Sequence, residues 1–312
     1  MPDNARKITY GAMMIALFAV LLAVSLYVPF IGNVTMLFIP LPILLYRLTY
    51  DRASSLLVTF AGVLLSMLVG GLFLVPLAFI LGLIGFVIGE TVKLGRSKLY
   101  IFMASALSLL ITTILMYVGA VFLFQFNFVE ELFRILREMQ DQMMETMRTF
   151  GGLPEGYEQM MESTFTMYEN TIPAIFILGI FSIAFILVTL NLAVARRLRH
   201  EVPKFPPFRN MKLPFITAVV YGILILITLF VKMEPGSDLY LMTMNATIIL
   251  RVLFLLQGIS LIHYYMYTMK VPKAVTGLLT VLALLLSPIT TFLGIIDTGV
   301  NIRAWIGRDK TK

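Results

Sequence analysis

The chain has 312 residues, of which 59% are hydrophobic and only 13% are charged, and its formal net charge is +7. In soluble domains about a quarter of all residues are charged, so an ordinary soluble domain is excluded. The sequence contains no cysteine, which excludes disulfides, thiol nucleophiles and thiolate-bound metals, and its two histidines exclude a multi-histidine metal site within one chain. The basic residues lie in short loops between apolar runs, which disfavours nucleic acid as a partner.

Continuous apolar runs of about twenty residues recur along the chain, and a helix of that length crosses a hydrocarbon core about 30 Å thick. They predict an all-α fold, a polytopic membrane helical bundle with about 8–10 membrane segments in the lipid bilayer. The expected segments are 8–28, 34–48, 53–73, 75–88, 99–124, 172–195, 213–231, 239–269, 274–286 and 289–305.

Small residues recur at helical spacing in the first segment, which we interpret as a transmembrane helix rather than a cleaved signal peptide. They are Ala12, Ala16, Ala19 and Ala23. Residues four apart share a helix face, and small side chains there let another backbone approach closely. This face is the candidate docking surface for a partner; the alternative is that alanine is simply common in such helices.

The second segment, 34–48, is short and interrupted by proline, which is typical either of a broken or re-entrant helix beside a cavity or of a short tilted helix. The fourth segment carries three glycines, which predict close helix packing. They are Gly82, Gly85 and Gly89.

The long polar interval 125–171 separates the fifth and sixth segments and holds nine acidic residues against three basic ones. Apolar residues recur in it at helical spacing, so we expect an amphipathic helical hairpin on or above the membrane surface. Its seven methionines could bind Cu(I), but adaptable packing is the favoured interpretation, and no metal or cofactor is expected. The acidic polar face favours contact with a partner protein or with the sixth helix.

The expected domains are a six-helix membrane domain at 1–200, a basic, proline-containing cytoplasmic linker at 201–212, and carboxy-terminal membrane helices at 213–312. With the amino terminus in the cytoplasm, the inner loops carry fifteen Lys and Arg residues against four outside. This positive-inside pattern predicts a cytoplasmic amino terminus and an extracellular hairpin. The basic tail then requires either a final helical hairpin broken at Pro288 or an interfacial helix on the outer face.

Of the polar residues inside the predicted spans, three form the candidate intramembrane site: Arg251, Asp297 and Asn191. An arginine at the bilayer centre costs about 2.5–3.5 kcal/mol, so Arg251 should face the bundle and have a partner. Asp297 is the expected partner. The pair is either an anion-binding or carboxylate-binding site or a structural ion pair, and Asn191 is a lesser candidate.

The first two hundred residues resemble the substrate-binding S components of energy-coupling-factor vitamin transporters. Those proteins have six helices, a short second helix and an Ala-xxx-Ala motif on the first helix that docks a membrane coupling subunit, and Ala12 and Ala16 stand at that motif. The whole chain is similar to an uncharacterised, YybS-type family of multi-pass membrane proteins in Bacillus-like Firmicutes. The resemblance implies a bacterial cell membrane, and the acidic insertion and the carboxy-terminal segments depart from an ordinary S component.

Two functions follow as hypotheses. The chain is a small-molecule-binding subunit of a transporter whose energy comes from a coupling subunit with ATPases, since it contains no phosphate-binding loop. Alternatively, it is a non-transporting scaffold for cell-envelope or sporulation-related machinery, with an extracellular protein bound at the acidic hairpin. An enzyme is not expected, because no paired carboxylate or Ser-His arrangement occurs within the spans.

Overall fold

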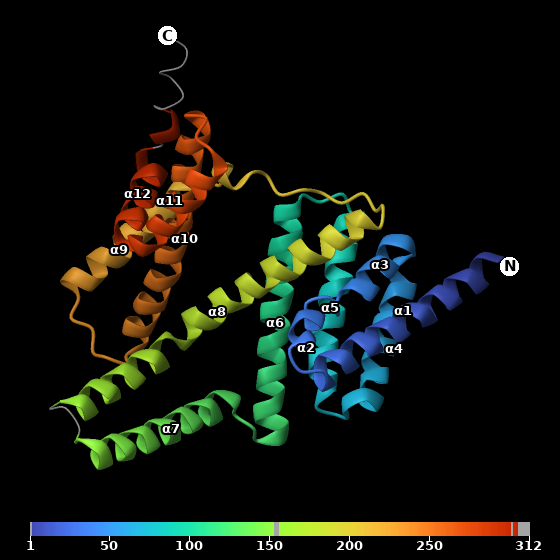
Figure 1. Ribbon diagram of the computed structural model, residues 1–312, viewed down its shortest axis with the longest axis horizontal. Coiled ribbons are helices and arrows are strands. Elements are labelled where there is room, and N and C mark those ends of the chain that lie inside the picture. Colours follow the sequence, from blue (N-terminus) through green and yellow to red (C-terminus); the bar gives the residue numbers. More distant parts are fainter. Residues whose placement is uncertain (1, 153–155, 301, 305–312) are drawn as a thin grey trace, which may run out of the picture. The chain divides into compact units, whose positions relative to one another are not determined.

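The computed structural model describes residues 2–152, 156–300 and 302–304, and every regular element in these ranges is helical (Figure 1). The chain divides into two compact units, which are described separately. Unit 1 comprises Met1–Tyr157 and Gly179–Lys204, and unit 2 comprises Glu158–Leu178 and Phe205–Lys312. The boundary near 204 lies in the expected linker, whereas the first part of the sixth membrane helix groups with the carboxy-terminal unit.

The prediction of a polytopic helical bundle is confirmed. Within the described ranges, seven helices are long and apolar enough to cross a membrane, and the bent pair of α11 (Lys273–Leu285) and α12 (Ser287–Val300) raises the number to eight if the pair forms one span. The seven are Asn4–Tyr27, Ile31–Thr49, Arg52–Gly70, Leu74–Lys93, Lys98–Phe124, Tyr157–Arg197 and Asp238–Thr268. Helix α9, Phe215–Phe230, is apolar but has only 16 residues, fewer than the roughly twenty that a span needs.

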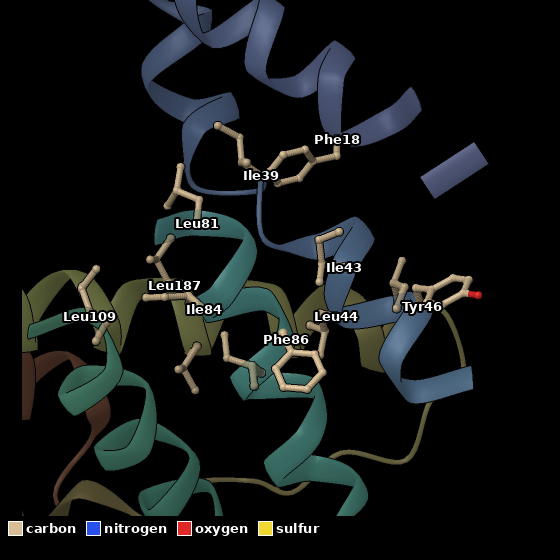
Figure 2. Close-up of a cluster of buried hydrophobic side chains, with 14 of the residues drawn as sticks. Phe18, Ile39, Ile43, Leu44, Tyr46, Leu81, Ile84, Phe86, Leu109 and Leu187 are labelled. Atoms are coloured by element: carbon tan, nitrogen blue, oxygen red, sulfur yellow. The ribbon is translucent and has the colours of Figure 1, made fainter. Parts of the chain in front are cut away.

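Unit 1 is built around one apolar core. Its helices are α1 (Pro2–Tyr27), α2 (Ile31–Met36), α3 (Leu41–Thr49), α4 (Arg52–Gly70), α5 (Leu74–Lys93), α6 (Lys98–Phe124) and α7 (Phe128–Phe150), joined by the later part of α8 (Tyr157–Arg197). Phe18, Ile43, Ile84 and Leu187 are buried together and bring α1, α3, α5 and α8 to the same core (Figure 2).

The second membrane segment is a broken helix, because α2 ends at Met36 and α3 begins at Leu41. Helix α5 packs against this break through two of the predicted glycines. A Cβ added at Gly85 would collide with the carbonyl oxygen of Pro40, and one added at Gly89 would lie 2.8 Å from Arg47 Cβ. Small residues here allow the close backbone approach that membrane helices use for packing.

Helix α8 differs from the prediction. The sequence predicts an amphipathic helix up to about residue 170 and a separate membrane helix from 172, but the two form one helix of 41 residues that contains Pro173. Proline interrupts the backbone hydrogen bonds of a membrane helix without ending it when neighbouring groups satisfy the freed atoms. Here the Asn245 side chain bonds to two backbone groups beside Pro173, the Ala174 N–H and the Asn170 carbonyl.

Unit 2 contains α9 (Phe215–Phe230), α10 (Asp238–Thr268), α11 (Lys273–Leu285) and α12 (Ser287–Val300), which gather in Figure 1. The 3₁₀ turn Phe208–Asn210 packs against α10. Helices α10 and α12 cross at two glycines. A Cβ at Gly258 would collide with the backbone of Thr290, and one at Gly294 with that of Phe254. Helices α11 and α12 meet at 102°, a right-angle bend rather than a straight span or a fully reversed hairpin.

Candidate functional site

A buried ion pair lies at the carboxy-terminal end of unit 2. Arg303 Nε donates to Asp297 Oδ2 at 2.9 Å, and the two side chains are only 3% and 1% exposed. Gln257 Nε2 donates to the same carboxylate oxygen at 2.6 Å. Asp297 Oδ1 has no hydrogen-bond partner within the described part of the chain. Two donors therefore compensate the buried carboxylate charge on one of its oxygens, as such a charge requires.

The other nitrogens of Arg303 fasten the basic linker to helix α10. Nη1 donates to the backbone oxygen of Arg209 at 2.6 Å, and Nη2 donates to Ser260 Oγ at 3.1 Å. Ser260 Oγ in turn donates to the backbone oxygen of Phe208 at 2.7 Å. The backbone N–H of Leu213 donates to Gln257 Oε1 at 3.1 Å. Residues 208–213 are therefore held against α10 by three buried polar side chains.

A cavity of about 200 Å³ adjoins this network and is called the basic cavity below. Its lining residues are Arg209, Asn210, Lys212, Tyr264, Arg303 and Ala304. Three of the six carry positive charge and none is acidic. The Arg209 guanidinium carbon lies 3.6 Å from the centre of the Tyr267 ring, which places that cation over an aromatic face. Such a lining attracts an anion.

The predicted pairing of Arg251 with Asp297 is wrong. Arg251 is exposed, and its Nε donates a long hydrogen bond of 3.4 Å to the Tyr221 hydroxyl. Asp297 bonds to Gln257 and Arg303 instead. Arg251 and Gln257 are six positions apart on α10, so a helix rise of 1.5 Å per residue puts them about 9 Å apart along the axis and on different faces. The signal for the observed pair was the occurrence of Asp297 and Arg303 in the same last apolar segment.

Asn191 satisfies the broken helix of unit 1. It is fully buried on α8, and its Nδ2 donates to the backbone oxygens of Leu37, at 2.9 Å, and Leu187, at 2.8 Å. Leu37 lies between α2 and α3, where its carbonyl has left the regular helix. Asn191 Oδ1 and Ser105 Oγ are buried and have no hydrogen-bond partner within the described ranges.

Asn245 bonds to backbone groups of an interrupted helix in unit 2, as Asn191 does in unit 1. The sequence alone indicated no role for Asn245. Its Oδ1 accepts from the backbone N–H of Ala174 at 2.8 Å, and its Nδ2 donates to the backbone oxygen of Asn170 at 2.8 Å. Those two groups are the i and i−4 partners of a regular helix. The side-chain amide is thus inserted into the helical turn of Pro173, and it also donates to Leu241 O at 2.8 Å.

The four candidate alanines of α1 differ in exposure. Helix α1 buries Met14, Phe18 and Leu22 in the core of unit 1, and it leaves Ala12 and Ala16 exposed. Ala19 and Ala23 are half-buried. On α5, a Cβ at Gly82 would lie 3.2 Å from Thr59 Cγ2, so this glycine faces α4, while Gly85 and Gly89 face α3.

Charged side chains close one end of unit 1. Arg47 Nε donates to Glu90 Oε2 at 2.6 Å, and Lys93 Nζ donates to the backbone oxygen of Tyr50 at 2.6 Å. Lys7 pairs with Asp51, and this cation together with the capping bond from the Ser54 backbone N–H holds the pKa of Asp51 well below its usual range. The loop at 47–52 is therefore built from ion pairs and caps rather than from an open set of polar groups.

Helix α7 carries the acidic character of the long polar interval. None of its residues is buried. Arg134 pairs with Glu131 and, at 2.7 Å, with Glu138, and the neighbouring guanidinium lowers the pKa of Glu131. Among the described residues, no group of three or more His, Asp or Glu side chains is placed to hold a metal ion.

Comparison with known proteins places the chain among membrane proteins. It is 25% identical over 308 residues to the uncharacterised protein YybS of Bacillus subtilis strain 168, covering 96% of this chain and 98% of that protein. No solved structure matches the chain. Residues 16–298 match the family described as predicted membrane protein, DUF2232. The chain therefore belongs to the DUF2232 family of predicted membrane proteins.

Proposed function

We propose that this protein is a small-molecule-binding membrane subunit of a transport system, and that a membrane coupling subunit with ATPases supplies the energy. The observation that carries the proposal is the outward alanine face of α1. Ala12 and Ala16 are exposed while Met14 and Phe18 are buried. Because positions two apart on a helix differ by about 200°, the alanines lie opposite the core-facing side.

An exposed pair of small residues suits docking of a second transmembrane helix. In lipid, helices associate through close packing rather than through hydrophobic burial, and small side chains permit the closest approach. The resemblance of residues 1–200 to S components, which dock their coupling subunit through an Ala-xxx-Ala face, supports the same partner class.

The broken segment of unit 1 supports a ligand-binding role. Transporters often place their sites at interrupted helices, because backbone groups freed there can bind a substrate. Here one such group, the Leu37 carbonyl, is held by Asn191, whose own Oδ1 is buried and unpartnered within the described chain. Asn191 is therefore the ligand-contact candidate in unit 1.

The test is co-purification of tagged, full-length protein from its native host in mild detergent, with mass spectrometry of the bound proteins. We expect wild-type protein to retain a membrane subunit and ATPase subunits, and Ala12→Leu/Ala16→Leu to lose them. Ala193→Leu, which enlarges an exposed alanine on α8, is the matched control and should retain them. Equal retention by wild type and the double variant would contradict this docking face.

The second candidate function is a scaffold that binds an extracellular protein, and α7 is the observation that favours it. A helix of 23 residues with no buried side chain and a strongly acidic polar face offers a surface for a basic partner. Under this hypothesis, the variant Asp141→Lys/Glu145→Lys no longer captures an envelope protein that the wild type captures, and its thermal unfolding midpoint is unchanged. Glu234→Lys, in a loop assigned to the same side, is the control. If both variants retain the same proteins, α7 is not the binding surface.

A further inference from the structure

We propose that the basic cavity of unit 2 binds a phosphate group, and that in the membrane this group is the headgroup phosphate of an anionic phospholipid. The inference goes beyond the transport proposal, because it concerns neither the alanine face of α1 nor Asn191. It rests on the residues that line the cavity and on the contacts that hold them.

The lining of the basic cavity is positively charged. Arg209, Lys212 and Arg303 line it, and among the residues that the structure describes no carboxylate does. The nearest acid in the network, Asp297, is 1% exposed and accepts from both Gln257 and Arg303. The Asp297 carboxylate offsets the charge of Arg303, and the Arg209 and Lys212 side chains bring two further positive charges to the lining.

The residues that line the basic cavity are preorganised. Arg303 Nη1 and Nη2 are fixed by the Arg209 carbonyl and by Ser260, so the guanidinium cannot swing away from the lining. The backbone that carries Arg209 and Lys212 is fixed by the bonds from Ser260 to Phe208 and from Leu213 to Gln257. Binding sites gain affinity when their supporting contacts already hold the geometry.

The basic cavity is small. A cavity of about 200 Å³ is below the roughly 300–1,000 Å³ of pockets that enclose drug-sized ligands. It fits one compact anionic group rather than a whole nucleotide or vitamin. Arginine recognises phosphate through paired N–H donors, and lysine adds a point charge, so the lining has the residue types that phosphate binding uses.

The position of the basic cavity in unit 2 favours a lipid ligand. The cavity lies beside the last turns of α10, where Tyr264 lines it and the exposed Tyr267 stacks under Arg209. Tyrosine is enriched at the headgroup level of a bilayer, and the positive-inside pattern of the sequence predicts the cytoplasmic face for this end. Basic pockets beside membrane helices on that face are suited to anionic lipid headgroups. A lipid phosphate is therefore the source that the location favours.

The experiment uses full-length protein in detergent containing either phosphatidylglycerol or phosphatidylcholine, with native mass spectrometry of the retained lipid. The variant is Arg209→Gln/Lys212→Gln, which removes two lining charges and keeps the Arg209 backbone oxygen that Arg303 needs. The matched control is Lys270→Gln/Lys273→Gln, which removes two charges that follow α10 but do not line the cavity.

We expect wild type and the control to retain phosphatidylglycerol in preference to phosphatidylcholine. The lining variant should lose roughly 25-fold in that preference, because each basic residue near an anionic surface contributes about 1 kcal/mol and about 1.4 kcal/mol is a tenfold change. The same lipid preference in all three proteins would overturn the proposal.

A second arm separates a lipid phosphate from a soluble one. The readout is the heat of binding, measured by isothermal titration calorimetry. Inorganic phosphate is titrated into protein in neutral detergent. A saturable change that the lining variant loses, without any lipid preference, would assign the phosphate site to a soluble ligand and overturn the lipid source.

Discussion

Single amide side chains stabilise the interrupted helices of this protein. Asn191 bonds to the carbonyl freed between α2 and α3, and Asn245 is inserted into the turn at Pro173. Thr290 acts similarly at the bend between α11 and α12, where its Oγ1 donates to the Ala283 oxygen at 2.8 Å. Unpaired backbone groups are costly in a membrane, so each break depends on one nearby side chain.

Replacing Asn245 with alanine therefore leaves two backbone groups of the Pro173 turn without a hydrogen-bond partner. The Ala174 N–H and the Asn170 carbonyl lose their partner, and each buried unsatisfied group costs about 1–3 kcal/mol. We expect Asn245→Ala to lower the thermal unfolding midpoint measured in detergent by circular dichroism. Asn4→Ala, at an exposed asparagine of α1, is the control. An unchanged midpoint for Asn245→Ala would show that the amide is dispensable at this turn.

The buried pair Asp297–Arg303 gives a second prediction, in the form of a double-mutant cycle. Removing one partner of a buried ion pair costs about 3–5 kcal/mol, since the other charge stays buried. We expect Arg303→Met to destabilise strongly, and Asp297→Asn added to it to restore part of the lost stability. The readout is the thermal midpoint of the single and double variants. Strictly additive losses would mean that the two charges do not stabilise each other.

At the scale of the helix, the sequence predicted the membrane segments and their packing glycines better than it predicted where one helix ends and the next begins. Apolar length and interruption by proline are local signals, so the long α10 could be predicted, and a broken second segment was one of two alternatives, beside a short tilted helix. The continuity of α8 through Pro173 could not, because it depends on Asn245, which is 72 residues further along the chain. The partner of Asp297 was missed for the same reason: only folding brings α10, α12 and residue 303 together.

The packing of α5 against the broken segment can be tested by adding one methyl group. A Cβ at Gly85 would collide with the Pro40 carbonyl, so Gly85→Ala must move α5 away from α3. We expect it to cost about 1–3 kcal/mol as overpacking does, and to lower the thermal midpoint. Gly119→Ala on α6 is the matched control, because nothing lies within 4 Å of its added Cβ. That variant should be neutral or more stable, since alanine favours helix by about 1 kcal/mol over glycine.

For the whole molecule, the two units combine different uses of charge. In unit 1 the Arg47–Glu90 ion pair lies at one end of the helices. In unit 2 the buried Asp297–Arg303 pair lies beside the basic cavity. The positive loops set the predicted orientation, in which Lys204 is cytoplasmic and both α7 and Lys232 are extracellular. Length and composition alone support the number of spans, but they do not determine which side of the membrane each loop occupies.

The absence of cysteine from the sequence makes this orientation directly testable. Single substitutions Glu145→Cys, Lys232→Cys and Lys204→Cys introduce one thiol each on an otherwise thiol-free chain, at exposed positions. In intact cells we expect a membrane-impermeant maleimide to label the first two variants, and Lys204→Cys only after lysis. The positive-inside bias of fifteen basic residues against four is the physical reason, because translocating basic loops is disfavoured during insertion. Labelling of Lys204→Cys in intact cells, with Glu145→Cys protected, would reverse the orientation and put the basic cavity at the outer surface.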